Sequence, residues 1–286
     1  MSLIELMMGL LLTSVASLGA FTAWAQGRAR YESAQTLGRL QERAQYVFST
    51  LEPELQLAGF FGVHGASLLP QAIEPASASS CGAGQATRLL APVETSSGYA
   101  LACTPQQPGA VADSAVLTVR RASAQSATPD AGRMQVLTSL EHPAARGVII
   151  DGALPAGVTL KPGVTELRDL IVRSWYVARE SDGSANGNGD PTEPALRVKS
   201  LTRVAGQPRF VDTEVMPGVE GLGVQLGVRD GALPGHVRWI DAGESPLGAA
   251  VVAVKLTLHL RSGPQARPVR HLSVTRRFAV RNAEAA

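Results

Sequence analysis

Aromatic residues, charged residues and cysteines are all scarce in this sequence of 286 residues. Aromatic side chains make up 5%, so the core volume has to come from valine, leucine, isoleucine and alanine. Charged residues make up 17%, compared with about a quarter in an average globular protein. The formal net charge of +2 is too small to indicate a nucleic-acid-binding protein. The apolar fraction of 45% still allows a substantial core, in one large domain or two small ones.

The sequence also lacks signatures of enzymes. Neither G-x-S-x-G nor H-E-x-x-H occurs. Gly221, Gly223 and Gly227 do not have the spacing of a nucleotide-binding loop, and no helix is predicted after them. The five histidines are scattered, and His259 and His271 fall on the predicted outer faces of strands. We therefore expect no enzymatic activity and no cofactor.

Only two cysteines are present, Cys81 and Cys103. No pair of histidines lies near them, so their spacing does not indicate a zinc site. If this part of the chain is exported, we expect the two cysteines to form one disulfide. Closing that loop would stabilise the fold by roughly 3 kcal/mol in the chain-entropy model.

No charge occurs between Leu6 and Gly27. This run is long enough to cross a bilayer as a helix, which takes about 20 residues. A secretory signal peptide has a basic start, a shorter apolar stretch and an A-x-A-like cleavage site. The run has no basic start, although Ala23-Trp24-Ala25 resembles a cleavage site. It therefore predicts a membrane-spanning helix, and a signal peptide is the alternative.

A single carboxylate, Glu5, stands at the start of this run. An ionisable group in a membrane segment is costly and usually functional. The nearest candidate partner of Glu5 is an α-amino group. It is either the amine of the same chain, at Met1, or that of a neighbouring subunit stacked with an axial offset. The alternative is that Glu5 reaches the lipid headgroups. Arg28 and Arg30 follow the run and favour a cytoplasmic location for the residues after it. This indicates an unusual topology or a basic leader that has been removed.

After Gly27 the pattern becomes that of an amphipathic helix. The apolar face is predicted to contain Leu40, Ala44, Val47, Leu51, Leu55 and Ala58, and the opposite face Arg39, Glu42, Arg43 and Glu54. We expect one helix from about Ser2 to Ala58, ended by Gly59 and roughly 85 Å long at 1.5 Å per residue. A kink or local break is expected near Ser49–Pro53, because Pro53 removes a backbone donor.

From Phe60 onward the helical period disappears and strand patterns follow. Apolar and polar residues alternate over Val252–Arg261, and Leu272–Val280 is predicted as the partner strand. Within the second strand, Arg276-Arg277 marks a bulge or an edge. Further strands are predicted at Ala115–Arg120, Met134–Leu137, Leu170–Arg179, Ala195–Val204 and Gly221–Val228. We expect a mainly antiparallel β head with long loops.

Two polar features of the head have more than one interpretation. The segment Asp182–Glu193 has the oxygen spacing of an EF-hand calcium loop, with Gly187 at the turn. Its flanks are predicted strands, and such hairpin loops are common without metal, so we assign no metal and keep calcium as the alternative.

The C-terminal part contains six arginines, Arg261, Arg267, Arg270, Arg276, Arg277 and Arg281. These arginines predict a solvated strand face; a weak groove for DNA or an acidic partner is the alternative, although aromatics for base stacking are lacking there.

The N-terminal residues MSLIELM resemble the processed N-terminus of a type IV pilin. In that family a prepilin peptidase cuts after a glycine and methylates the new amine. Glu5 matches the family glutamate that pairs with a neighbouring N-terminus, here Met1. Five further segments resemble those of the PilW-type minor pilins: RLQERAQYVFSTLEPELQLAGFFG, RSWYVARE, ALRVKSL, VMPGVEGLGVQLGVRDG and VVAVKLTLHLRS. Residues 60–165 match nothing specific, and Pro53 stands where the family usually has a helix former.

The resemblance implies an α+β, pilin-like fold. Residues 1–27 would form the transmembrane or filament-core half of the helix, 28–58 an amphipathic half packed on the head, and 59–286 the β-rich head. It implies a minor pilin with its head in the periplasm before assembly and at the tip of an extracellular pilus afterwards. The implied partners are the inner membrane, the prepilin peptidase, other minor pilins, the major pilin and, as a further candidate, a tip adhesin; nucleic acid is not an expected partner. The alternatives are a J-type pseudopilin of a type II secretion system and a membrane-tethered binding protein that does not polymerise.

Overall fold

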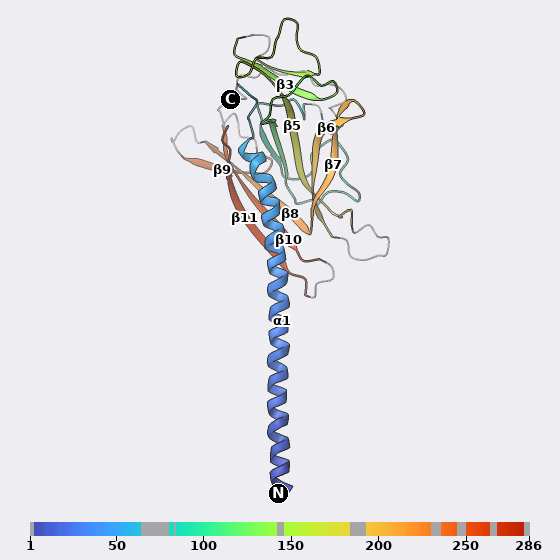
Figure 1. Cartoon of the computed structure of the whole chain (residues 1–286), viewed down its shortest axis with the longest axis vertical. Coiled ribbons are helices and arrows are strands. Elements are labelled where there is room, and N and C mark those ends of the chain that lie inside the picture. Colours follow the sequence, from blue (N-terminus) through green and yellow to red (C-terminus); the bar gives the residue numbers. More distant parts are fainter. Residues whose placement is uncertain are drawn as a thin grey trace.

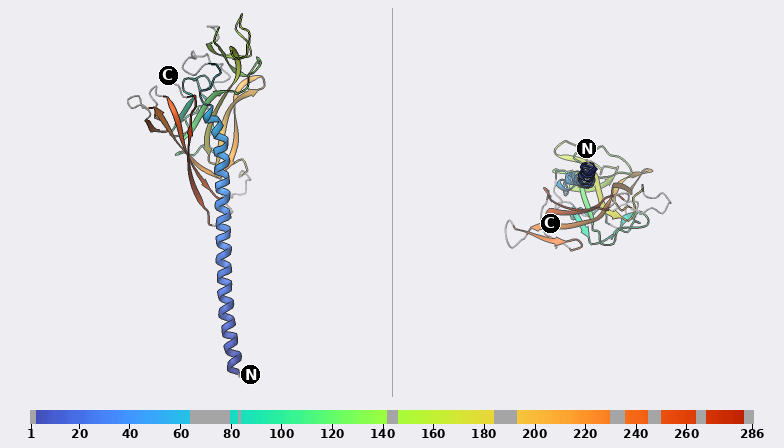
Figure 2. Two further views of the ribbon diagram at one scale, coloured as in Figure 1. Left: turned by 60° about the vertical axis from the view of Figure 1, so that its left-hand side comes forward. Right: turned by 90° about the horizontal axis from the view of Figure 1, so that it is seen from below.

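One long helix carries a β-rich head at its C-terminal end (Figure 1). In this computed structural model the described residues are 3–63, 80–82, 84–141, 146–183, 193–229, 236–244, 250–263 and 268–282. The helix, α1 (Leu3–Gln56), has 54 residues. Its N-terminal half extends beyond the head, and its C-terminal half lies against it (Figure 1 and Figure 2). The expected combination of one long apolar helix with a β-rich head is confirmed.

The two halves of α1 differ in their surroundings. All residues from Leu3 to Glu32 are exposed. In the second half a stripe faces the head, and its buried members are Leu40, Ala44, Val47, Phe48, Leu51, Glu54 and Leu55. The stripe confirms the predicted apolar face, which continues to the buried Ala58 beyond the end of the helix. Glu54 was predicted on the opposite, polar face, and this prediction is wrong, because Glu54 is buried.

The local break expected near Ser49–Pro53 is wrong, because α1 is uninterrupted through Pro53 to Gln56. Ser49 and Pro53 both lie on the exposed side of the helix. The Ser49 carbonyl that loses its partner at Pro53 therefore faces the solvent side, where water can bind it, while the buried stripe holds the helix from the other side. The helix ends two residues earlier than expected, and Gly59 takes the left-handed conformation of a helix stop, with φ of 79°.

The strands form two sheets, in which every pairing is antiparallel. The seven-stranded sheet contains β1 (Val93–Ser96), β2 (Val116–Ala122), β3 (Met134–Ser139), β4 (Arg146–Asp151), β5 (Thr165–Ala178), β6 (Ala195–Val204) and β7 (Gln207–Pro217). Its order is β1-β2-β5-β3-β4, and β6 also pairs with β5 and carries β7. The four-stranded sheet has the order β11-β10-β8-β9, formed by β8 (Val219–Arg229), β9 (Val237–Asp241), β10 (Val251–Arg261) and β11 (His271–Ala279).

Each predicted strand is present, with ends that shift by a few residues, and β10 pairs with β11 as expected. The bulge considered at Arg276-Arg277 is wrong, because the pairing of β10 with β11 is continuous there. The other interpretation, an edge strand, is confirmed. Arg276 takes an inward position between Val274 and Phe278 and places its guanidinium 5.6 Å from the Phe278 ring centroid. Its aliphatic stem can cover apolar surface there while its charge stays near solvent.

The largest buried cluster joins all three layers of the molecule. Leu51 and Leu55 of α1 meet Trp175 of the seven-stranded sheet and Leu256 and Leu258 of the four-stranded sheet in this cluster. The second half of α1 is therefore part of the core of the head. This packing fixes the direction in which the exposed half leaves the head.

Replacing Leu51, which has no exposed surface, with alanine should lower the free energy of unfolding by about 2–5 kcal/mol, because it leaves a cavity between three layers. Denaturant unfolding of the full chain in detergent, followed by tryptophan fluorescence, measures this change. Tyr46→Ala on the exposed side of the same helix is the control and should change stability by less than about 0.5 kcal/mol. Equal losses in the two variants would contradict the assignment of Leu51 to the core.

Candidate functional site

The exposed half of α1 is an unusually apolar surface. An 18-residue window has a mean hydropathy of 1.8, and none of it is buried. Large side chains such as Leu12, Phe21 and Trp24 are mostly exposed. An apolar surface of this extent marks a site of contact with lipid or protein. By length and composition the helix can cross a membrane, and a signal sequence near an N-terminus has the same properties.

Glu5 lies in the first turn of α1, between the exposed apolar side chains of Ile4 and Leu6. A carboxylate in the first turn of a helix interacts favourably with the unpaired backbone N–H groups there. Met1 lies outside the described residues. The pairing of Glu5 with a terminal amine therefore stays a prediction.

The end of the uncharged run is marked by an aromatic and ionic group. Arg28 places its guanidinium 5.9 Å from the ring centroid of Trp24 and donates to Glu32 at 2.9 Å. Tyr31 is exposed on the same stretch. Trp, Tyr and Arg side chains of this kind gather where hydrocarbon meets water.

A buried ionic group holds the C-terminal end of α1 to the head. Arg121 of β2 donates through Nε and Nη2 to the two carboxylate oxygens of Glu54, both at 2.9 Å. Arg173 of the neighbouring strand β5 donates to the same carboxylate. Bidentate pairs between arginine and carboxylate are strong and directional. The sequence reasoning missed this role, although position 54 follows 47 and 51 by seven and three residues and so lies on the apolar face of the helix.

A second buried ionic network lies between β5, β6 and β7. Asp212 accepts hydrogen bonds from Tyr176 Oη at 2.6 Å and from Lys199 Nζ and Arg197 Nε at 2.7 Å each. Burial alone raises the pKa of Asp212, but these three donors outweigh it and hold the pKa of the carboxyl below its ordinary value. Burial also raises the pKa of the Tyr176 hydroxyl, which therefore stays protonated and donates. This network was not predicted, and the alternate basic residues at 197 and 199 of β6 were its only local signal.

The expected disulfide between Cys81 and Cys103 is formed. The segment that it closes is also fastened to this network. Tyr99 donates its hydroxyl to the Cys103 carbonyl at 2.7 Å, and Lys199 Nζ donates to the Thr104 carbonyl at 2.9 Å. The disulfide, Lys199 and Tyr99 therefore hold the same loop over β5 and β6.

Arg120 of β2, which has no exposed surface, contacts the loop that follows Cys81. Its guanidinium donates to the carbonyls of Gln85 and Ala91, both at 2.8 Å, and to Glu94 at 2.9 Å. Carbonyl oxygens of a loop have no strand partner, so a buried arginine satisfies several of them at once. Gln85, Ala91 and Glu94 are thereby fixed to the head.

The described residues contain no group of three or more potential metal ligands. Of the predicted loop Asp182–Glu193, residues 184–192 lie outside the described part. At its two ends, Asp182 accepts from Arg197 at 2.7 Å and Glu193 from Arg43 at 3.3 Å. These two candidate ligands are therefore engaged with guanidinium groups.

The remaining candidate groups lie at the surface. His259 and His271 are exposed, as expected. Among the C-terminal arginines, Arg276 lies 3.8 Å from Glu52, and Arg277 lies over the ring of Trp239. Arg267 lies outside the described residues. Arg270, Arg277 and Arg281 are exposed, as expected, whereas Arg261 is only 24% exposed with its Nε buried, and Arg276 is half-buried and contacts the helix.

Comparison with protein-family models, curated proteins and solved structures finds no match to this chain. The assignment of a function therefore depends on the residues and contacts described above.

Glu54→Gln should lower the free energy of unfolding by about 3–5 kcal/mol, because it leaves the guanidinium of Arg121 buried without a countercharge. Denaturant unfolding of the full chain measures the loss. Glu52→Gln is the matched control. Its side chain is 38% exposed and 3.8 Å from Arg276, so it should cost less than about 1 kcal/mol. A loss of the same size in both variants would contradict the anchoring role of Glu54.

Asp212 should make the stability of the head depend on pH. Its pKa is lower in the folded state than in the unfolded state, so its contribution is present above the unfolded pKa and is lost as pH falls through the folded pKa. Asp212→Asn should cost about 2 kcal/mol at neutral pH, and the difference from the native chain should shrink in acid. Thermal unfolding between neutral pH and about pH 3 measures it, with the exposed Asp113→Asn as control. A difference independent of pH would contradict the network.

Proposed function

We propose that this chain is a PilW-like minor pilin, which is held in the inner membrane and then joins other minor pilins in the complex that primes and caps a type IV pilus. The observation that carries the proposal is one continuous helix with two surfaces. Its first half is apolar on all sides and exposed, and its second half is part of the core of a β head. Such a helix suits a membrane first and a bundle of like helices afterwards.

Glu5 provides the specific step in this proposal. A charged carboxylate among apolar side chains is costly in hydrocarbon or in a helix bundle unless an opposite charge neutralises it. The methylated amine of a neighbouring subunit supplies that charge when the helices stack with an axial offset. A neutralised pair favours only those arrangements in which the two groups meet, so it also sets the register of the subunits.

The head provides the surfaces that contact the other subunits. The core contacts and the Glu54 anchor hold it rigidly on the helix, so it moves with the helix into the assembly. Its other faces remain for contacts with neighbouring minor pilins and with a tip adhesin. The disulfide supports a head in an oxidising compartment, such as the periplasm or the exterior of the cell.

Glu5→Ala should abolish incorporation into pili while membrane insertion and head stability are kept. Immunoblotting of sheared pili and of membranes from the native host measures the two fractions, and we expect at least a tenfold loss from pili, the equivalent of about 1.4 kcal/mol. Glu42→Ala is the control, since Glu42 is exposed on the second half of the same helix. It should leave incorporation unchanged.

The same experiment separates the alternatives. Normal incorporation of Glu5→Ala would contradict the proposed pairing. A protein absent from pili in both forms, with an activity that Glu5→Ala leaves intact, would point instead to a membrane-tethered binding protein. Enrichment with type II secretion components, and not with pilins, would point to a J-type pseudopilin.

A further inference from the structure

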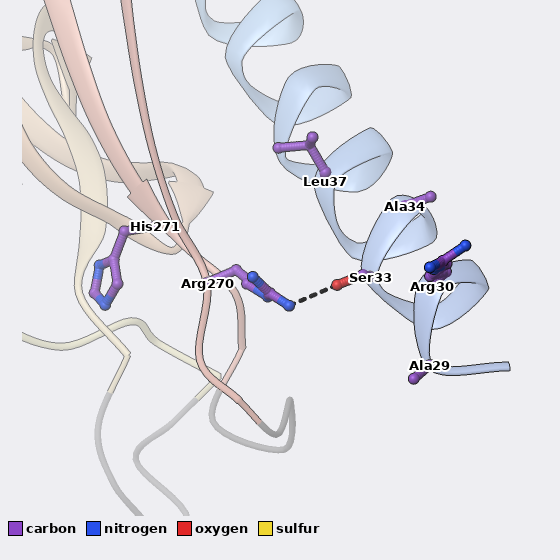
Figure 3. Close-up of a pocket in the computed structure, with 7 residues that line it drawn as sticks. All are labelled: Ala29, Arg30, Ser33, Ala34, Leu37, Arg270 and His271. Atoms are coloured by element: carbon purple, nitrogen blue, oxygen red, sulfur yellow. Dashed lines mark hydrogen bonds between the residues drawn. The ribbon is translucent and has the colours of Figure 1, made fainter. Parts of the chain in front are cut away.

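An open groove lies between α1 and the start of β11, directly above the apolar half of the helix (Figure 3). The residues that line it are Ala29, Arg30, Ser33, Ala34, Leu37, Arg270 and His271. Its volume is about 600 Å³, within the range of small-molecule sites. Arg270 reaches across it and donates from Nη2 to Ser33 Oγ at 2.6 Å, which ties the lower end of the head to the helix.

The position of the groove along the helix matches the headgroup layer of a membrane. If the uncharged run fills the hydrocarbon, Arg30 lies ~4.5 Å and Ser33 ~9 Å beyond Gly27, at 1.5 Å per residue. The headgroup region on each side of a bilayer is about 5–7 Å thick, the difference between a 30 Å core and a total of 40–45 Å. Arg30 therefore lies at the level of the phosphates, and Arg270, which is bonded to Ser33, lies just above them.

The groove contains two arginines, Arg30 and Arg270, that no carboxylate of the described residues pairs with. Within the described parts of the chain, neither Arg30 nor Arg270 takes part in an ion pair, whereas Arg28 pairs with Glu32, and His271 forms a hydrogen bond with Glu220 at 2.8 Å. The lining also contains two polar residues, Ser33 and His271, and its other members, Ala29, Ala34 and Leu37, are small or apolar. Two guanidinium groups beside apolar walls suit a ligand with an anionic head and an apolar body.

We propose that this groove binds the headgroup of an anionic phospholipid while the chain is in the membrane, before it enters a filament. The proposal rests on the membrane stage of the proposed function. Guanidinium groups bind phosphate oxygens in a bidentate manner, and a basic residue near an anionic membrane surface contributes about 1 kcal/mol. A bound lipid would hold the lower end of the head at the membrane surface and fix its orientation before assembly.

The test uses the full chain reconstituted in vesicles made of equal parts of phosphatidylcholine and phosphatidylglycerol. Spin-labelled lipids of each type report their relative binding constants for the protein. The native chain should prefer phosphatidylglycerol. Arg30→Gln/Arg270→Gln should bring the preference close to one, a loss of about thirtyfold at about 1 kcal/mol for each arginine.

Two control variants separate a built site from general electrostatics. Arg209→Gln/Arg238→Gln makes the same change of charge at exposed residues of β7 and β9 that do not line the groove. Arg28→Gln/Glu32→Gln removes an ion pair near the level of the groove without changing the net charge. Both control variants should keep the preference for phosphatidylglycerol.

Each failure has its own signature. Flotation of the vesicles after extraction with alkaline carbonate first shows whether the chain is inserted; a chain that does not float would contradict the membrane stage of the proposed function. An inserted native chain without lipid preference would overturn the lipid site alone. So would a preference that all three double variants lose equally, or one that disappears as the ratio of protein to lipid is lowered, which would indicate a contact between copies of the chain.

Discussion

The described part of the chain leaves the apolar surface of α1 between Leu3 and Trp24 uncovered. The described parts of the head pack only against the second half of the helix, whose first half-buried residue is Ser33. Water is a poor solvent for so large an apolar area. Lipid and a bundle of like helices both satisfy it, and the proposed function uses them in succession.

The same helix can serve both environments because its head is attached at the other end, and firmly. The core cluster joins α1 to both sheets, and Glu54 adds a directional contact with Arg121 and Arg173 on adjacent strands. A buried ionic contact contributes less to stability than to geometry, because a carboxylate with two guanidinium partners allows few alternative arrangements. The axis of the helix is thereby fixed relative to the sheets.

The head is stabilised by several buried charges as well as by its apolar core. Arg120 satisfies loop carbonyls, Asp212 gathers three donors, and the Cys81–Cys103 disulfide closes the loop that both regions support. These groups lie beside irregular backbone, which they hold in place. In a sequence with few aromatic residues, large apolar side chains do less of this work. The groove beside Ser33 lies at the opposite, lower end of the head, where Arg270 contacts the helix.

The sequence by itself determined what depends on near neighbours along the chain. The uncharged run before Gly27 predicted the exposed apolar half-helix, the recurrence of Leu40, Val47 and Leu51 predicted the packed half, and alternation predicted β10, because 3.6 and 2 residues are fixed periods of the backbone. Only the tertiary structure decided which partners meet across long separations: Glu54 with Arg121, Lys199 with Asp212, and Arg270 with Ser33. The strands β1, β4, β7 and β9, which were not predicted, belong to that second group, as does the intact helix at Pro53, because neighbouring strands and the packed face supplied what the local sequence lacked.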